Sequence, residues 1–299
     1  MPLAFCEQAR AQACCTATGN SDVGIVRPGA RAALALESSW EHASWSYAAD
    51  ARQHALHDAR ADDWVLAVGG GYRVWRPLQL HGALPLRLQR RRLGDETAET
   101  DVRPGDALLG ARFLLHEDPM PAHAAPRLAQ VEAFSFSKIP TGRDANEAEA
   151  RTGVDATGDG VWQLGLGLGA ALRVPRVHWF DASVGFALRF PHTVEGRELE
   201  PGDEVQARAS YAWVPDVYLA LGTFASYRAT LPAKENGVEL AESSTRRFRV
   251  GIFARHALRH PSWHLQTSLS SDLPFDGFGR NVPYAGTTLS LSILRTWIR

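Results

Sequence analysis

Arginine recurs at alternate positions in segments that are otherwise rich in leucine, alanine, glycine and serine. The guanidinium group is always charged and carries several donors, so rows of arginine can bind anions or line a polar passage. The candidate lining residues, with a few other polar side chains, are Arg31, His81, Arg87, Arg112, Gln163, Arg173, Asp181, Arg189, Gln206, Arg208, Arg228, Arg247 and Arg249. If nearby acids pair with these arginines, the same residues would instead plug the passage. Both interpretations stay open.

Serine and histidine could supply a nucleophile and a base, but no motif joins them here. Ser135 and Ser137 lie on a segment that could approach His116. A catalytic group of this kind also needs an orienting residue close by. Serine on a strand is usually a small polar wall residue, so we expect no catalytic site. A lipid-modifying enzyme is kept only as a third alternative.

Two polar segments contain residues of metal-binding type without a complete ligand set. The first group consists of His42, His54 and His57 with Asp50, Asp58, Asp62 and Asp63. The second group, Asp155, Gly158 and Asp159, is similar to a calcium loop but lacks the full series of oxygen ligands. Loop histidines beside carboxylates are usually solvated. We therefore expect no metal and no other cofactor.

The elements that carry the arginines are predicted to be β-strands. In 160–174, Leu164 and Leu166 share one face while Gln163 and Arg173 share the other. This period of two places successive side chains on opposite faces of a strand. About twelve segments show it, near 29–40, 64–75, 78–89, 105–116, 127–138, 160–174, 177–190, 203–214, 217–230, 247–252, 263–269 and 289–294.

The predicted strand 127–138 has the least regular alternation. Gln130 and Glu132 fall on the same face as Leu128 and Phe134. Either one face is misread or a β-bulge shifts the register within this strand.

The connections between the predicted strands alternate between long and short. The odd-numbered ones are long and polar, beginning with 41–63, whereas most even-numbered ones shrink to a few residues around proline, as at Arg76-Pro77 and Pro215-Asp216. Short periplasmic turns and long extracellular loops are typical of transmembrane barrels, and a soluble sandwich has no reason to segregate them. We predict an all-β fold, a transmembrane antiparallel up-and-down barrel of about twelve strands.

Aromatic residues cluster near the ends of the predicted strands. Tryptophan and tyrosine prefer the headgroup region of a bilayer, where an apolar ring and a polar atom are both satisfied. The residues predicted to form this membrane girdle are Trp40, Trp75, Trp162, Trp179, Tyr211, Trp213, Trp263 and Trp297.

The composition agrees with a barrel and excludes some other classes. The chain has 299 residues and a formal net charge of -1, which argues against a nucleic-acid partner. No apolar run approaches the ~18 residues of a membrane-spanning helix. The mean hydropathy of -0.21 resembles that of a soluble protein, because only half of each barrel strand needs to be apolar.

The N-terminal segment 1–28 differs from the predicted barrel, 29–299. Its three cysteines, Cys6, Cys14 and Cys15, are the only ones in the chain. They could form a small disulfide loop, or they could belong to a removed leader. The sequence Ala11-Gln12-Ala13 has the small-x-small form of a cleavage site, but the apolar run of a signal peptide is missing. We expect that the start lies inside a longer signal peptide.

With these strands and turns, the chain resembles the bacterial outer-membrane β-barrel superfamily over 29–299. Small porin-like channels and hydrophobic-compound transporters of about twelve strands are the most similar members. The resemblance implies an outer-membrane location, contacts with the lipid bilayer and the outer-membrane assembly machinery, and passive transport of a small solute. A structural or surface-interaction barrel with a plugged lumen is the alternative. Members usually end in an aromatic residue, whereas here Ile298 and Arg299 follow Trp297.

Overall fold

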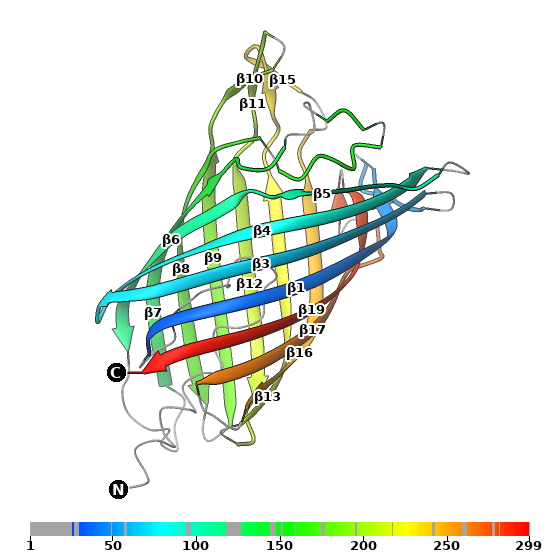
Figure 1. The fold of residues 1–299 in the computed structure, drawn as a ribbon. Helices are drawn as coiled ribbons and strands as arrows, with labels where there is room; N and C mark the ends of the chain where they lie inside the picture. The colour runs from blue at the N-terminus through cyan, green and yellow to red at the C-terminus, as the bar shows by residue number, and fades with distance from the viewer. Residues whose placement is uncertain are drawn as a thin grey trace, which may run out of the picture.

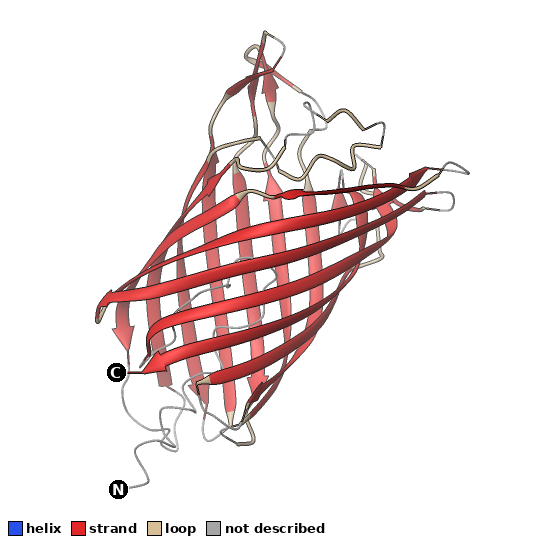
Figure 2. Ribbon diagram, viewed as in Figure 1, coloured by secondary structure: helices blue, strands red, loops and turns tan. Residues whose placement is uncertain are grey.

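The computed structural model is a closed β-barrel (Figure 1, Figure 2). It describes residues 26, 30–48, 50–56, 59–93, 97–117, 127–143, 148–150, 152–158, 160–174, 177–194, 196–216, 218–240, 243–258, 262–276, 279–280 and 282–298. Within these ranges, no helix is long and apolar enough to cross a membrane. Of the predicted N-terminal segment only Val26 is described, so Cys6, Cys14, Cys15 and the proposed cleavage site lie outside the described residues.

Twelve strands form the barrel, and each pairs antiparallel with the next one along the chain. They are β1 (Ala30–Tyr47), β3 (Ala59–Trp75), β4 (Leu78–Leu93), β6 (Ala107–Glu117), β7 (Arg127–Ile139), β8 (Gln163–Val174), β9 (His178–Arg189), β12 (Glu204–Trp213), β13 (Leu219–Thr230), β16 (Arg246–Ala257), β17 (Trp263–Asp272) and β19 (Val282–Ile298). The ring closes where β1 pairs with β19, from Ala32 opposite Trp297 to Tyr47 opposite Val282. Closure leaves no strand edge exposed to lipid, as a membrane requires. The predicted topology and strand number are confirmed.

The two ends of the barrel differ in the length of their connections (Figure 1). Tight turns, such as Arg76-Pro77 between β3 and β4, lie at the end where the chain terminates. The long connections at the other end contain the minor strands β2 (Gln53–Ala55), β5 (Glu99–Pro104), β10 (His192–Val194), β11 (Arg197–Glu200), β14 (Lys234–Glu235), β15 (Val238–Glu239) and β18 (Gly279–Arg280). By the rule for outer-membrane barrels, the tight turns are periplasmic and the long loops extracellular.

Four minor strands form a separate sheet above the extracellular rim, in the order β10-β11-β14-β15 (Figure 1). The β14–β15 hairpin turns at Asn236 and Gly237, whose φ angles are 50° and 79°. Two consecutive residues with positive φ form the tight turn whose twist matches that of paired strands, and Asn-Gly is its preferred sequence. The hairpin is thus encoded locally, although its strands are too short to show an alternating pattern.

The first two barrel strands extend beyond their predicted ends. The predicted loop 41–63 is largely strand, because β1 continues to Tyr47 and β3 begins at Ala59. Outside the hydrocarbon neither face of a strand needs to be apolar, so the hydropathy pattern ends while backbone pairing continues. His42 lies opposite Asp62 in this extension.

A bulge explains the irregular pattern of β7. The register against β8 shifts between Leu128 and Gln130. Leu128 is therefore exposed on the outside, whereas Ala129 is buried and Gln130 and Glu132 face inward with Phe134. The extra residue of a bulge exchanges the inward-facing and outward-facing positions in the part of the strand that follows it. The bulge, one of the two predicted explanations, is confirmed.

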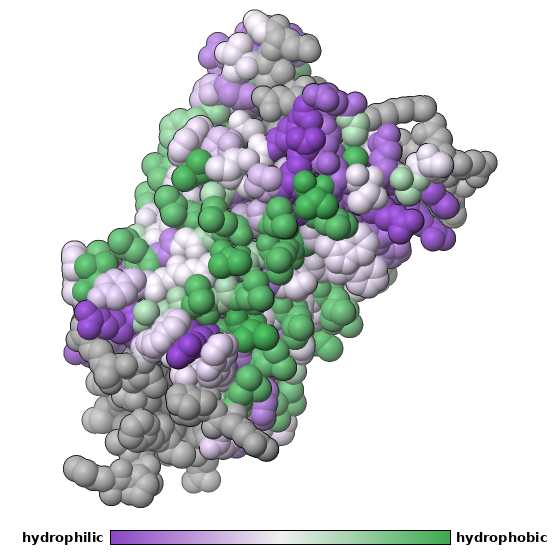
Figure 3. All heavy atoms as spheres, viewed as in Figure 1, coloured by the Kyte–Doolittle hydropathy of each residue, from purple (hydrophilic) through white to green (hydrophobic). Residues whose placement is uncertain are grey.

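The outer surface of the barrel is apolar. Leu84 and Leu166 are each 66% exposed, whereas Gln163, on the inward face of the same strand as Leu166, is 3% exposed. Figure 3 shows hydrophobic residues gathered across the middle of the barrel, with hydrophilic residues toward the extracellular end. Leucine normally avoids water, so a continuous belt of this kind indicates contact with hydrocarbon.

Aromatic side chains lie at both ends of this belt. Trp40 and Trp162 are exposed toward the extracellular loops. The outward residues near the periplasmic turns are Trp75, Tyr211, Trp213, Trp263 and Trp297. The Arg295 guanidinium lies 5.2 Å from the Trp263 ring and 4.9 Å from the Trp297 ring. Cationic and aromatic side chains commonly anchor barrels at this level.

Trp179 does not belong to this girdle, so its prediction is wrong. It is 5% exposed and packs inside the barrel. Trp179 is near a strand end, as the prediction requires, but it shares the inward parity of Asp181. Phe180, the next residue, carries the outward ring.

Candidate functional site

The candidate site is the lumen of the barrel. Apart from Arg31, the predicted lining residues occupy the alternate strand positions whose side chains face the lumen. The strand register places them side by side. Gln163 lies opposite Arg189, and Arg228 lies between Gln206 and Arg247. His81 and Gln163 are buried, so the inward side chains pack against one another rather than standing free.

Arg31 lies on the outside of the barrel, contrary to its prediction. A register irregularity between Ala30 and Ala32 removes Arg31 from the alternating pattern. Its Nε donates to the hydroxyl of outward-facing Tyr72 at 2.9 Å, and its guanidinium lies 5.5 Å from the Tyr72 ring. Arg31 is therefore an exterior anchor near the periplasmic end.

Four charged side chains from β1, β16 and β17 form an ion-pair cluster in the extracellular half of the lumen. Arg247 binds Asp272 through Nε and Nη2, both at 2.7 Å, and also binds Glu41. Arg249 Nη2 lies 3.0 Å from Glu41 and 3.3 Å from Asp272. The Gly286 backbone N–H donates to Asp272 at 2.9 Å. Two cations and two anions balance, so the cluster is a neutral, fixed part of the wall.

Other inward cations also lie beside carboxylates of neighbouring strands. These pairs are Arg112 with Glu132, Lys138 with Asp106 at 3.6 Å, Arg87 with Asp63 at 3.9 Å, and Arg228 with Glu204 at 3.1 Å. Each pair reduces the local field of its cation, because opposite charges at these distances largely cancel beyond the pair. The lumen is therefore rich in charge without being uniformly positive.

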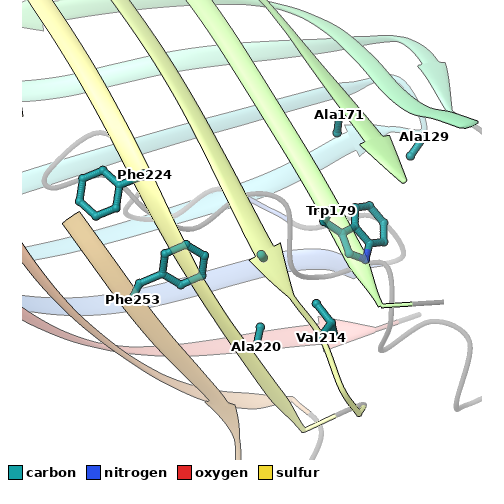
Figure 4. Close-up of a cluster of buried hydrophobic side chains, with 8 residues drawn as sticks. Ala129, Ala171, Trp179, Val214, Ala220, Phe224 and Phe253 are labelled. Carbon is teal, nitrogen blue, oxygen red and sulfur yellow. The ribbon is translucent and has the colours of Figure 1, made fainter. Parts of the chain in front are cut away.

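An apolar cluster covers part of the inner wall toward the periplasmic end (Figure 4). Its members are Ala129, Ala171, Trp179, Ala212, Val214, Ala220, Phe224 and Phe253. The Arg173 guanidinium lies 4.4 Å from the Trp179 ring, and that of Arg208 lies 5.7 Å from the Phe224 ring. Both distances allow cation–π attraction. The wall thus combines aromatic faces with positive charge.

Inward aromatic rings lie flat against glycines of neighbouring strands. A Cβ at Gly165 would lie 2.2 Å from the Phe136 ring, and one at Gly222 would lie 2.4 Å from the Phe253 ring. Glycine at these positions provides the space that the ring occupies. Large inward side chains can thus fit within a narrow cylinder.

This packing predicts the effect of adding one methyl group. Gly165→Ala should lower the free energy of unfolding by about 1–3 kcal/mol, because the ring or the backbone must move. The measurement is urea unfolding in detergent followed by tryptophan fluorescence. The control is Gly70→Ala, where a Cβ would find ordinary contacts at 3.5 and 3.8 Å. Equal stability of the two variants would contradict the packing argument.

The long connection between β7 and β8 folds against the inner side of the extracellular mouth. Gln89 of β4 faces inward and is 2% exposed. Its amide, in the orientation that satisfies both atoms, donates to the carbonyl oxygens of Val154 at 2.8 Å and Ala156 at 3.3 Å. Thr157 Oγ1 donates to the Pro104 carbonyl at 2.8 Å. These bonds hold the segment 152–158, here called the mouth loop, across part of the opening.

Asp155 maintains the conformation of the mouth loop. Its carboxylate accepts the backbone N–H groups of Glu149 at 2.9 Å and Ala150 at 3.2 Å, and it pairs with Arg143 at 2.8 Å. Burial alone would raise the pKa of Asp155, but these hydrogen bonds and the Arg143 charge lower it below 3.8. Asp155 therefore stays ionised at neutral pH and organises the loop.

Removing this charge should loosen the mouth loop. Asp155→Asn should increase hydrogen exchange of the Glu149 and Ala150 amides roughly tenfold to hundredfold, which corresponds to about 1–3 kcal/mol. Acid should act similarly: the stabilisation is complete above pH 3.8 and is lost as the pH falls through the lowered pKa. The control is Asp276→Asn in another loop, where Asp276 accepts from Gln53 N–H. Unchanged exchange in Asp155→Asn would contradict this role.

The structure gives positions for some of the alternative catalytic and metal-binding candidates. Ser135 pairs with Ala111, five residues from His116, which is roughly 16 Å along the strand. His42 Nδ1 is bonded to Asp62 at 2.8 Å. The described residues contain no group of three or more His, Cys, Asp or Glu side chains able to hold a metal ion. His57, Asp58 and Asp159 lie outside the described residues.

Several lumen residues are absent from the predicted set. Glu41 and Asp272 complete the ion-pair cluster, and Arg255 is 4% exposed on the inner face of β16. Glu37, Ser39 and Glu41 occupy alternate positions, and this pattern, which continues past Trp40, could have indicated that Glu41 faces the lumen. The mouth loop gave no periodic signal, because its position depends on hydrogen bonds to distant strands.

Comparison with solved structures finds barrels of similar fold. An outer membrane channel from Pseudomonas putida F1 has 14% sequence identity and a TM-score of 0.71, covering 94% of this chain and 100% of the other. NanC porin has 6% identity and a TM-score of 0.49, covering 89% of this chain and 100% of the other. The transport unit of the autotransporter AIDA-I from Escherichia coli has 9% identity and a TM-score of 0.48, covering 90% of both chains.

Sequence comparison adds nothing to this likeness in fold: no family model matches the chain, and no curated protein matches it. The closed twelve-strand ring and the exposed leucine belt require a membrane. The chain therefore has the fold of an outer-membrane β-barrel.

Proposed function

We propose that this barrel is a passive channel for small solutes, which cross the outer membrane along its polar inner face. The observation that supports this most is the charged inner surface, which runs from Arg247 and Glu41 near the extracellular end to Arg173 near the periplasmic end. Charged side chains within a membrane are costly unless they face water or one another. A barrel that serves only as an anchor does not need them.

The solutes that pass are proposed to be small. The ion-pair cluster, the inward rings of Phe224 and Phe253, and the mouth loop all occupy part of the lumen. Because many arginines are paired with acids, the channel is proposed to favour anions only modestly. The bilayer is its environment, and the outer-membrane assembly machinery is the proposed partner for its insertion.

The second candidate is a plugged barrel whose extracellular loops bind a partner. Val26 favours it, because this residue is 2% exposed and packs against Ala30 and Ala33 of the inner wall. Arg73 Nη2 also approaches the Val26 carbonyl at 3.5 Å. Val26 thus lies inside the periplasmic end of the lumen.

Single-channel recording in planar bilayers separates the two candidates. A channel should give steady, small current steps, and the reversal potential in a salt gradient should show a modest anion preference. A plugged barrel should stay silent although its heat-modifiable gel mobility shows that it is folded. Silence from folded protein would overturn the transport proposal.

A further inference from the structure

A groove on the outside of the barrel lies near its extracellular end. It has a volume of about 730 Å³ and is formed mainly by β3, β4 and β5, with Ser38 of β1 and Ala98 at its borders. Trp64, Leu66, Leu86, Leu88 and Val102 give it an apolar lining. All five have outward parity, so the groove opens toward the bilayer and not toward the lumen.

The strand register arranges the residues of this surface in layers. Leu66 lies opposite Leu86, and Trp64 lies opposite Leu88 at the next level. At the next level of outward-facing residues, Asp62 lies opposite Arg90. The surface thus changes from apolar to aromatic to charged toward the extracellular side, which matches the change from hydrocarbon to headgroups.

Three outward arginines border the charged end of the groove. Arg90 lines the groove, and Arg60 lies directly opposite Arg92. Among the described residues, no hydrogen bond or ion pair engages any of the three, and the shielded Nε of Arg92 has no acceptor. Like charges placed side by side repel, so this arrangement favours a bound anion.

The acid directly opposite Arg90 in the strand register is already engaged. Asp62 lies opposite Arg90, but its Oδ1 accepts from the His42 ring at 2.8 Å and from Trp40 Nε1 at 3.3 Å. Arg90 is exposed beside it, and no acid within the described ranges forms an ion pair with it. The positive charge is therefore not cancelled by its direct cross-strand neighbour.

We propose that this surface binds one lipopolysaccharide molecule of the outer leaflet, with an acyl chain of lipid A in the groove and a lipid A phosphate on Arg60, Arg90 and Arg92. The two halves of the site match the two halves of such a lipid, and their order along the strands matches its orientation in the outer leaflet. Guanidinium groups bind phosphate oxygens in bidentate geometry. Basic clusters at membrane level are a common means of lipid headgroup recognition.

The test is a titration of the full-length protein, in detergent, with purified lipid A, followed by native mass spectrometry. The variant combines Arg60→Ala, Arg90→Ala and Arg92→Ala. Its affinity for lipid A should fall at least about thirtyfold, since several charge-assisted hydrogen bonds are lost. The matched control combines Arg31→Ala, Arg76→Ala and Arg295→Ala, which removes the same charge from the periplasmic end. The control should keep its affinity within about twofold.

Further titrations test whether binding requires the phosphate and the acyl chain of lipid A together. Dephosphorylated lipid A should bind the wild type as weakly as lipid A binds the triple variant. Ala98 also lines the groove, so Ala98→Trp fills it without removing an arginine and should weaken lipid A binding about tenfold. Phosphatidylglycerol and inorganic pyrophosphate test other sources of phosphate, and both should bind much more weakly than lipid A.

Heat-modifiable mobility confirms that each variant is folded before it is titrated. If the triple variant does not fold, Arg90→Gln alone replaces it and should weaken binding about three- to tenfold. Equal affinity of the arginine variant and the control would overturn the proposal, as would equal binding of phosphatidylglycerol or pyrophosphate. The groove lies outside the barrel, so this result does not depend on whether the lumen conducts.

Discussion

Replacing Asp272 by asparagine should lower the free energy of unfolding of the barrel by about 3–5 kcal/mol. Asp272 is 1% exposed and binds both Arg247 and Arg249. Its loss leaves two partly buried guanidinium groups with Glu41 as their remaining acid. An uncompensated buried charge is far more destabilising than the loss of a single hydrogen bond. Urea unfolding in detergent, followed by tryptophan fluorescence, measures the effect.

Two further variants isolate the role of charge. Asp276→Asn changes an exposed acid in the adjoining extracellular loop and should alter stability by less than about 0.5 kcal/mol. Adding Arg247→Gln to Asp272→Asn removes the unpaired cation and should recover much of the lost stability. If Asp272→Asn is no less stable than Asp276→Asn, the cluster does not stabilise the wall.

Shortening the mouth loop should increase single-channel conductance severalfold. Replacing 152–157 by two glycines removes the segment that Gln89 and Pro104 hold across the opening. The strands at either side keep their pairing, so the barrel itself should persist. An extracellular constriction commonly limits the flux through a barrel of this size. Recording in planar bilayers gives the conductance directly.

The matched control shortens a different extracellular element. Replacing the β14–β15 hairpin tip, 235–238, by two glycines alters a sheet that stands above the rim. This control should leave the conductance unchanged. Equal conductance of the mouth-loop variant and the wild type would show that the constriction lies elsewhere.

Most of the barrel could be predicted because membrane strands have a local code. At each strand position the residue type is polar or small where the side chain faces the lumen and apolar where it faces lipid, as Gln163 and Leu164 show. The connections add a second local signal, since turns such as Arg76-Pro77 are short for geometric reasons. Together these signals predict topology and strand number without information on any distant contact.

The remaining features depend on contacts between distant segments or on small register shifts. The bulge beside Ala30 moves Arg31 to the outside, and no hydropathy rule indicates its position. Glu41 continues the alternation of Glu37 and Ser39, but its pairing with Arg247 of β16 joins residues far apart in the sequence and needs the structure. The arrangement of Arg90 and Arg92 beside Arg60 likewise needs the register of β3 against β4.

The proposed channel requires that the inner face of the barrel is a water-filled path while the outer face contacts lipid. Ser290 and Leu291 test it directly, because they are neighbours on β19 with inward and outward parity. Cysteine is introduced at each position after Cys6, Cys14 and Cys15 have been replaced by serine, and a charged methanethiosulfonate reagent is added during single-channel recording. The current should fall stepwise for Ser290→Cys and stay unchanged for Leu291→Cys. A response at Leu291→Cys alone, or no current from either folded protein, would contradict it.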